Sequence, residues 1–477
     1  MRRGMTAALS VLAVGLVAAA CGGTPGSDTN NSSSAAPAAT TGAAGGAAST
    51  AAAAPAVQTD GFQSLGPIVL NVWSYDNQDP GLMPVITELT KQFEAKYPNV
   101  KINLTFKDFN SLVAVVNRAL ASDNGPDITE GNQGYQIDAE EVKAKLIIPL
   151  DKYVQAYGWD KWWGPDTNQI FQWTENGKTF GEGPTWGIAQ TGQNVGLFYN
   201  KKKLADLGLQ IPATFDEFNT MLATAKSKLG SDPVFEFGNK EGYGTIHFMG
   251  GIQGAYGDAK PLRDWIYHVP GSTFVTDQNS KALTTLKDWA ANGYFNKDFN
   301  AVGYDQAAAE FAKGKGLFFV GGNWETAIIK KGLGSDAGMV NMPPGPSGKH
   351  VGVGATSGPW HISAKSKYPD VAAAWLNYIH ASPEAFDLMY GALQIPSVST
   401  APPPPASDPF LGEVTASWQQ LVQDGGLTLY TDWASPSMYD TLAKNFQEVM
   451  AGKTSPTDAM TAIQQDWSKF DAELQKG

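Results

Sequence analysis

The sequence has one cysteine, few basic residues, and no long apolar run after its first 20 positions. A single cysteine in 477 residues excludes an internal disulfide and any metal site built from a cluster of cysteines. Lys and Arg number 34 against 46 Asp and Glu, so the formal net charge is −12. That balance argues against a nucleic-acid partner, which would require an excess of positive charge. No apolar run of about 18 residues follows residue 20, which excludes a polytopic membrane protein.

The lone cysteine directly follows a segment with the layout of a secretory signal. Arg2 and Arg3 precede an apolar stretch over residues 7–20, which ends in three alanines before Cys21. This arrangement resembles the bacterial lipoprotein signal, although Ala18 stands where that family usually has Leu. The resemblance implies a signal peptide over 1–20, lipidation of Cys21, and an extracytoplasmic protein anchored to the cell membrane. The alternative is an ordinary secreted protein in which Cys21 is incidental.

The next segment has the composition of a flexible tether. Residues 22–60 are almost entirely Gly, Ala, Ser, Thr and Pro, with Asp28 and Asp60 as the only charges. Such a stretch buries too little apolar surface to offset the entropy lost on ordering. We therefore predict a lipidated Cys21 and tether over 21–66, and a globular part that begins near Pro67.

Strand-like and helical patterns alternate along the globular part. Residues 68–73 are apolar except for Asn71, and 82–93 carry apolar residues at helical spacing. Apolar and polar residues alternate along 100–106, and 127–130 are expected to form a short strand. This rhythm predicts an α/β fold with a parallel sheet, and later segments repeat it. Ligands of such sheets bind outside the carboxyl ends of the strands, so residues 73–77 and 131–136 are expected at one edge.

An ordered set of short motifs spans about 400 residues. In order, they are LNVWS at 70–74, FEAKYPNV at 93–100, GPDI at 125–128, IPLD at 148–151, GLFYNK at 196–201, FAKGKG at 311–316, GNWE at 322–325 and AAAWL at 372–376. This set resembles the extracellular solute-binding proteins of bacterial carbohydrate ABC importers. The resemblance implies a receptor that captures a carbohydrate outside the membrane and delivers it to a membrane permease.

The same resemblance implies two α/β lobes that close around a ligand cleft at crossover hinges. The first lobe is expected to take 67–192 plus 321–357, and the second 193–320 plus 358–477. The resemblance also implies a monomer without a cofactor.

A sugar needs flat aromatic platforms for its C–H faces and side chains that donate and accept hydrogen bonds for its hydroxyls. Aromatic, amide, carboxyl and hydroxyl side chains in loops at strand ends and crossovers meet that need. The candidate ligand residues are Trp73, Asp76, Asn77, Asn132, Gln133, Tyr135, Gln193, Asn323, Trp324, Glu325, Thr356, Ser357, Trp360 and Trp433. Richness in aromatics favours an oligosaccharide over a monosaccharide.

Each candidate has a structural alternative. Trp73 could pack in the core, residues 131–136 could serve only as a turn, and Gln193 could belong to the hinge. Three other tryptophans fall on helical apolar stripes and are expected in the core, namely Trp289, Trp375 and Trp467. The roles of Trp159, Trp162 and Trp163 stay open among core, cleft and permease contact.

Enzymatic signatures are weak in this sequence. The five histidines lack metal-ligand spacing, and no Gly-x-Ser-x-Gly motif occurs. We therefore expect no catalytic site and no metal. Two alternatives remain, a receptor of the same fold for a cationic or peptide solute and a surface glycoside hydrolase. An anionic solute is disfavoured because Arg118 and Arg263, the only arginines of the globular part, lie outside the candidate loops.

Overall fold

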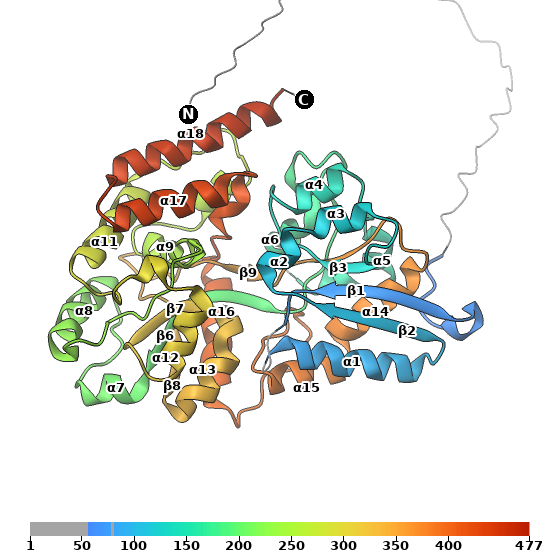
Figure 1. The fold of residues 1–477 in the computed structure, drawn as a ribbon, viewed down its shortest axis with the longest axis horizontal. Helices are drawn as coiled ribbons and strands as arrows, with labels where there is room; N and C mark the ends of the chain where they lie inside the picture. Colours follow the sequence, from blue (N-terminus) through green and yellow to red (C-terminus); the bar gives the residue numbers. More distant parts are fainter. Residues whose placement is uncertain (1–55, 78–80, 164, 477) are drawn as a thin grey trace, which may run out of the picture. The chain divides into compact units, whose positions relative to one another are not determined.

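The structure is a computed structural model that describes residues 56–77, 81–163 and 165–476. Residues from Ala56 onward form one compact unit. Within it, two lobes of mixed helix and strand lie side by side (Figure 1). The expected signal peptide, Cys21 and most of the expected tether lie outside the described residues.

The first lobe is built on a sheet of four strands. They are β1 (Ile68–Ser74), β2 (Val100–Phe106), β3 (Ile128–Glu130) and β10 (Trp360–Ile362), in the order β10-β3-β1-β2. β1 runs parallel to both β2 and β3, which confirms the parallel sheet expected there, while β10 is antiparallel to β3. Burial alternates along β1, so one face of the strand faces the core and the other does not.

Helices and a small hairpin complete the first lobe. The helices are α1 (Leu82–Lys96), α2 (Phe109–Val113), α3 (Val116–Ala121), α4 (Asp138–Lys143), α5 (Asp151–Tyr157), α6 (Pro165–Asn168), α14 (Pro369–Ala381) and α15 (Pro383–Gly391). The hairpin pairs β4 (Gln172–Trp173) with β5 (Phe180–Thr185). The side chain of Asp108 caps α2 by accepting a hydrogen bond of 2.9 Å from Ser111 N. Late in the chain, α14 and α15 return to pack against α1 (Figure 1).

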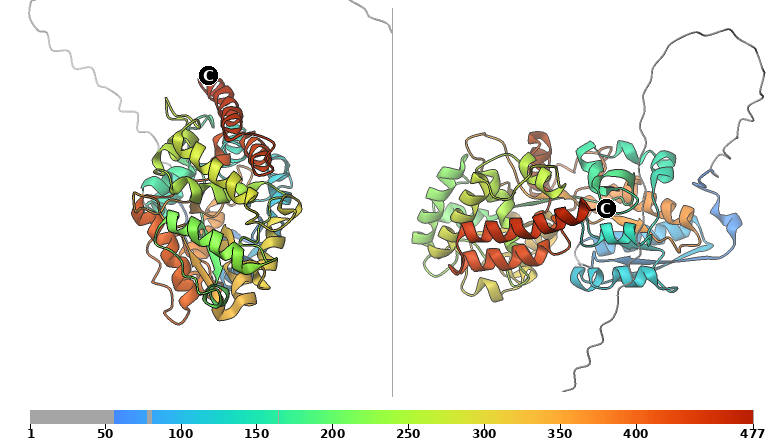
Figure 2. Two further views of the ribbon diagram at one scale, coloured as in Figure 1. Left: turned by 90° about the vertical axis from the view of Figure 1, so that its left-hand side faces the viewer. Right: turned by 90° about the horizontal axis from the view of Figure 1, so that it is seen from above.

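The second lobe has a different sheet. Its strands are β6 (Gly192–Asn200), β7 (Phe318–Gly322), β8 (Ala337–Val340) and β9 (Gly354–Thr356). The three others all pair antiparallel with β6, so the parallel pattern of the first lobe is not repeated. The helices of this lobe are α7 (Lys201–Asp206), α8 (Phe215–Leu229), α9 (Tyr243–Gly254), α10 (Lys260–Ile266), α11 (Asp277–Ala291), α12 (Tyr304–Ala312), α13 (Thr326–Leu333), α16 (Pro409–Asp424), α17 (Met438–Met450) and α18 (Pro456–Leu474). Seen from above, α17 and α18 lie together and α18 ends over the junction of the lobes (Figure 2).

Strand pairing corrects the expected division of the return segments. Residues 321–357, expected in the first lobe, carry β8 and β9, which pair with β6 of the second lobe. Residues from 358 to the end of α15, expected in the second lobe, carry β10, which pairs with β3 of the first. Only residues 357–359 separate β9 from β10, so the chain crosses between lobes there. Local pattern identifies a strand but not its partner, because partners are chosen by tertiary packing.

The tryptophans expected in the core are there. Trp289, Trp375 and Trp467 are at most 6% exposed. The open question about the other three is also answered, since Trp159 stacks on Tyr157 with ring centroids 5.4 Å apart and Trp162 stacks on His380 at 5.9 Å. Trp159, Trp162, Trp163 and His380 are buried, and with the partly buried Tyr157 they form an aromatic cluster of the first lobe.

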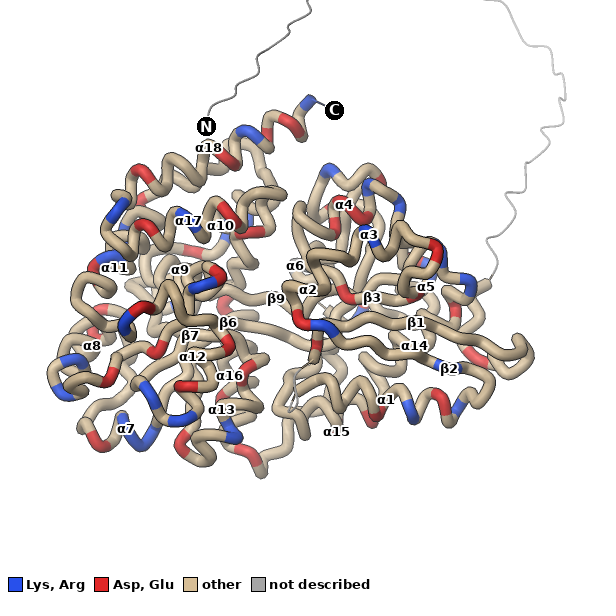
Figure 3. The backbone as a smooth tube through the Cα atoms, viewed as in Figure 1, with Lys and Arg blue, Asp and Glu red and all other residues tan. Residues whose placement is uncertain are grey.

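The distribution of charge and the character of the helices bear on the class of protein. Acidic and basic residues are interspersed over the helices of both lobes (Figure 3). Among the described residues, none of the helices combines the length and the apolar character needed to cross a bilayer.

Trp360 provides a test of the first-lobe core. Its side chain is fully buried and meets Trp375 edge-on with ring centroids 5.4 Å apart, so the structure places this candidate ligand residue in the core. We expect Trp360→Ala to lower the free energy of unfolding by about 3–5 kcal/mol, because the truncation leaves a large cavity. Chemical denaturation measures this change. Trp73→Ala, at a partly exposed site, is the control and should cost clearly less; equal losses would contradict the assignment of Trp360 to the core.

Candidate ligand cleft

A cavity of about 600 Å³ lies between the lobes at the carboxyl ends of β1, β2 and β3. The first lobe contributes the loops that follow these three strands. The second lobe contributes residues of α9, α12 and α17 and of two short 3₁₀ turns, Asn323–Glu325 after β7 and Thr431–Ala434 before α17. This is the edge at which the parallel sheet predicts a ligand site.

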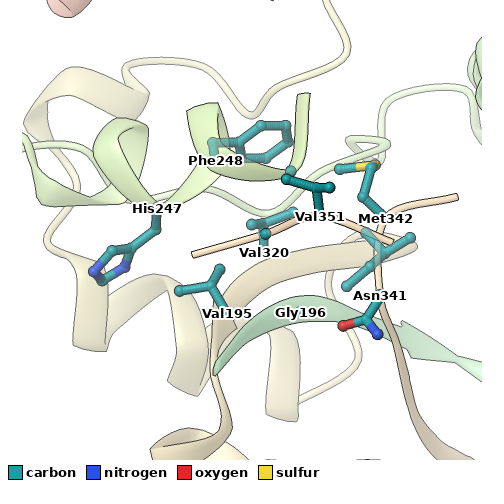
Figure 4. A pocket seen from close by; sticks show the side chains of 11 residues that line it. Val195, Gly196, His247, Phe248, Val320, Asn341, Met342 and Val351 are labelled. Carbon is teal, nitrogen blue, oxygen red and sulfur yellow. The ribbon is translucent and has the colours of Figure 1, made fainter. Parts of the chain in front are cut away.

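A second, much smaller pocket lies inside the second lobe. It is lined by Val195, Val320 and Met342 among others, and Figure 4 shows mostly apolar side chains around it. Its volume of about 10 Å³ is at the limit for one water molecule, so it has no room for a solute. The large cleft is the candidate site because it lies at the carboxyl ends of the parallel strands.

Polar side chains dominate the first-lobe wall of the cleft. Asp76 and Asn77 follow β1, Asp108 and Asn110 follow β2, and three amides follow β3. Those amides belong to Asn132, Gln133 and Gln136. Nε2 of Gln133 donates to the carbonyl oxygen of Ser357 at 2.9 Å, so this side chain also joins the cleft loop to the crossover. Together the three loops present many hydrogen-bond acceptors and donors to one space.

A carboxyl pair lies at the floor of this wall. Glu130, fully buried at the end of β3, accepts hydrogen bonds from Ser74 Oγ at 2.5 Å and from Tyr75 N at 2.9 Å. Burial raises the pKa of Asp76 to about 6, and burial together with the nearby Asp76 raises the pKa of Glu130. Asp76 and Glu130 share a side-chain hydrogen bond, and Asp76 itself lines the cleft.

Aromatic side chains form the second-lobe wall. Tyr243 and His247 come from α9, Tyr304 from α12 and Trp324 from the turn after β7. The His247 ring meets those of Tyr304 and Trp324 edge-on, with centroids 5.5 Å away in each case. Tyr430 and Trp433 lie next to this group and next to each other, with centroids 5.1 Å apart. Such a wall offers flat apolar faces with polar edges.

Acidic side chains outnumber basic ones in the described lining of the cleft. Its lining includes six carboxyl side chains, and none of the described lining residues is Lys or Arg. Four of the six come from the second lobe, namely Asp305, Glu325, Asp432 and Asp440. Burial raises the pKa of Asp432 to about 6. This charge distribution disfavours an anionic ligand and suits a neutral or cationic one.

Comparison with known families agrees with this architecture. The model of the family described as bacterial extracellular solute-binding protein matches residues 75–385. The chain belongs to that family. The solute-binding protein has the two-lobed fold with a cleft that its sequence predicts, and the family places it outside the cytoplasm.

Individual relatives are more distant. The diacetylchitobiose binding protein DasA of Streptomyces coelicolor is 28% identical over 312 residues, which cover 64% of this chain and 68% of that protein. The multiple sugar-binding protein of Streptococcus mutans is 27% identical over 201 residues, 41% of this chain and 47% of the relative. Among solved structures, a chitin oligosaccharide binding protein superposes with a TM-score of 0.73 at 19% identity, over 85% of this chain and 99% of that one.

The structure of the solute-binding protein brings nine of the fourteen candidate residues to the cleft. These are Asp76, Asn77, Asn132, Gln133, Gln193, Trp324, Glu325, Thr356 and Trp433. The other five are placed elsewhere, namely Trp73, Tyr135, Asn323, Ser357 and Trp360. Most of these five are neighbours in sequence of residues that do line the cleft, but their own side chains are not part of its lining.

Two of the five are aromatic residues with other packing partners. The ring of Trp73 lies under Lys107, whose Nζ is 4.7 Å from the ring centroid. Tyr135 meets Trp173 and Phe470 edge-on at 5.0 and 4.8 Å, and its backbone N donates to Trp433 O at 3.1 Å. Tyr135 therefore joins the two lobes beside the cleft.

Two more are polar residues that hold the crossovers. Nδ2 of Asn323 donates to Gly192 O at 3.0 Å, and Oγ of Ser357 accepts from Thr191 N at 3.2 Å. Both side chains are buried, so their hydrogen bonds are internal ones.

Several lining residues were missed by the sequence. They are Asp108, Asn110, Tyr243, His247, Tyr304, Asp305, Gln394, Tyr430, Asp432, Tyr439 and Asp440. Many of them lie on helices. In a helical pattern, an aromatic residue is normally interpreted as a core residue and a carboxylate as part of the solvent-exposed face. Tyr430 and Asp432 could have been found from the sequence, because they are close neighbours of the candidate Trp433.

Proposed function

We propose that this protein is the solute receptor of an ABC importer and acts as a monomer. It captures a carbohydrate, with an oligosaccharide favoured over a monosaccharide, and delivers it to the permease. The observation that carries the proposal is the division of the cleft into a polar wall and an aromatic wall, without a basic side chain in the described lining. The hydroxyls of a sugar form hydrogen bonds with the polar wall, and its C–H faces pack against the aromatic wall. A neutral polyhydroxylated solute satisfies both.

Relatives and dimensions support the same class. The names of the two relatives describe binding of diacetylchitobiose and of multiple sugars by those proteins. The cavity of about 600 Å³ lies well inside the range of about 300–1,000 Å³ for small-molecule sites. That room favours more than one sugar ring.

The crossovers provide a route for closure. Gly192 N donates to Ile395 O at 2.9 Å and Ser357 N to Thr191 O at 2.8 Å, so three crossing segments lie together. A rotation confined to these segments would close the polar wall onto the aromatic wall. In our proposal that motion buries the ligand and forms the surface that the permease recognises.

A second candidate is a receptor of the same fold for a cationic solute. It is favoured by the six carboxyl groups of the cleft and by the high pKa of Asp76 and Asp432, each about 6. A protonated amine would be stabilised by several of these groups at once. A panel of ligands separates the two candidates.

Such a panel tests the function directly. We expect at least one neutral oligosaccharide to raise the melting temperature and to change the tryptophan fluorescence. Trp324→Ala should weaken its binding about 30-fold, since loss of a buried aromatic anchor costs about 2 kcal/mol. Isothermal titration calorimetry measures the affinity.

The matched control is Trp73→Ala, which removes a tryptophan outside the cleft and should leave the affinity unchanged. Equal losses in both variants would contradict the aromatic wall. A panel in which only polyamines or peptides bind would replace the carbohydrate by the second candidate. Turnover of a glycan would instead support a glycoside hydrolase.

The acidity of Asp76 predicts a pH dependence of binding. In the free protein its pKa is about 6, and a ligand hydroxyl that donates to the ionised carboxylate lowers that pKa in the complex. Affinity should therefore be constant above about pH 7 and fall by roughly tenfold for each unit below 6. Asp76→Asn should bind more weakly at pH 7.5 and show a smaller fall.

Asp440→Asn is the control for this experiment, because Asp440 is an exposed carboxyl at the same cleft. It should keep the pH dependence of the unmodified protein. An unchanged slope in Asp76→Asn would contradict the role of Asp76.

We further propose that Cys21 is lipidated and tethers the receptor to the cell membrane. The support is the sequence of residues 1–21 and the tether composition that follows. Intact-mass spectrometry of the mature protein should show an amino terminus at Cys21 with added lipid, and Cys21→Ser should lose both. A lipid-free mature chain would indicate an ordinary secreted protein.

A further inference from the structure

Three ionisable side chains meet inside the first lobe, away from the ligand cleft. His361 comes from β10, and Asp138 and Glu141 come from α4. All three side chains are buried, with exposed fractions of 1%, 2% and 0%. One ligand atom from each lies within 4.8 Å of the other two.

One imidazole nitrogen faces both carboxylates. Nε2 of His361 is 3.2 Å from Asp138 Oδ1 and 3.6 Å from Glu141 Oε2. When Nε2 is protonated, it donates a hydrogen bond to Asp138 Oδ1. Neither oxygen of Glu141 then has a hydrogen-bond partner anywhere in the described chain. Glu141 is then left with the longer 3.6 Å contact to His361 Nε2, and a further positive charge or ligand would offset more of its desolvation.

The other imidazole nitrogen already has its partner. Nδ1 of His361 lies 2.8 Å from the carbonyl oxygen of Trp186, which is an acceptor only. When a cation displaces the Nε2 proton, the remaining proton of the imidazole is held on Nδ1 and the lone pair of Nε2 is directed toward the two carboxylates. Histidines that bind metals are oriented by just such an outer hydrogen bond.

The two distances from His361 Nε2 to the carboxylate oxygens suit a small divalent cation. In a tetrahedral zinc site with bonds of about 2.0–2.2 Å, neighbouring ligand atoms lie about 3.3–3.6 Å apart. The distances from Nε2 to the two carboxylate oxygens, 3.2 and 3.6 Å, match this spacing.

A glycine keeps the space beside Nε2 open. A Cβ atom at Gly131 would lie 2.6 Å from Nε2 of His361 and 3.1 Å from Oδ1 of Asp138. Any side chain at residue 131 would therefore crowd the centre of the cluster.

We propose that His361, Asp138 and Glu141 bind one Zn²⁺ ion, through Nε2 and one carboxylate oxygen each. The ion neutralises the two buried carboxylates together and gives Glu141 a closer partner than the 3.6 Å contact with His361. It also joins α4, which follows the cleft loop of Asn132 and Gln133, to β10, which follows the crossover at 357–359. The proposal does not depend on the identity of the transported solute.

Zinc binding by the full chain tests the site. Protein freed of metal with a chelator is dialysed against Zn²⁺, and bound zinc is measured by mass spectrometry. We expect one zinc per chain, a higher melting temperature with Zn²⁺ than with chelator, and X-ray absorption that shows nitrogen and oxygen ligands near 2.0 Å. A sulfur ligand near 2.3 Å would assign the metal to Cys21 and overturn the proposal.

Glu141→Gln and His361→Gln should each lose the bound zinc and the zinc-dependent rise in melting temperature. Glu141→Gln keeps the size of the buried side chain, so it remains testable even where His361→Gln does not fold. The matched control is His350→Gln, which removes a histidine 3.2 Å from the single carboxylate Asp424 in the other lobe and should retain one zinc. Absence of zinc from the unmodified protein, or its retention in Glu141→Gln, would overturn the proposal.

Discussion

The hydrogen bonds among the three crossing segments hold the two lobes in register, and the cleft depends on them. Ser397 N donates to Gln190 O at 3.0 Å, which extends the contacts between the segments at 190–192, 356–357 and 395–397. Buried polar side chains reinforce this junction, among them Asn323 and Ser357. In a buried setting each such donor and acceptor must be paired, so the junction admits few alternative arrangements.

The junction places two chemically different walls opposite each other. Strand ends of the first lobe supply amides and carboxyls, while helices and turns of the second supply aromatic rings. The walls approach closely at Gly134, which has a φ of 93°, and a Cβ there would lie 2.6 Å from Cβ of Trp433. Only glycine adopts this backbone without strain and leaves room for the second lobe. A close lobe contact therefore depends on a residue that contributes no side chain.

The first lobe buries acidic side chains in two clusters. Their desolvation is unfavourable, and hydrogen bonds and ion pairs from the surrounding structure offset it. Glu130 is held by Ser74 and by the backbone of Tyr75, and this pairing fixes the loop that carries Asp76. Asp138 and Glu141 are held around His361, behind the cleft loop. Both clusters lie at the ends of the same loop region, so the polar wall is supported by charged groups as well as by apolar packing.

Much of the architecture could be predicted from the sequence because it rests on local patterns. Alternation along 100–106 and helical spacing along 82–93 reflect the repeat of each element, and the parallel first sheet follows from their order. Two of the three loops that line the first-lobe wall, at 73–77 and 131–136, were located in the same way, as segments after strand ends, whereas the loop after β2 was not. The family is indicated by the ordered motifs alone, because their order along the chain is itself a property of the sequence.

Only the tertiary structure decided which segments share a sheet and which side chains face the cleft. β9 and β10 are separated by three residues, yet they join different sheets, because strand partners are set by packing across the whole domain. Tyr135 and Trp433 come from predicted loops, but one packs between the lobes and the other lines the cavity. Tyr243 and Tyr304 lie on helices and reach the cleft only because the second lobe is folded against the first. The sequence by itself determined the elements, their order and the kinds of side chain available; long-range contacts determined their neighbours, since those contacts join residues far apart in the chain.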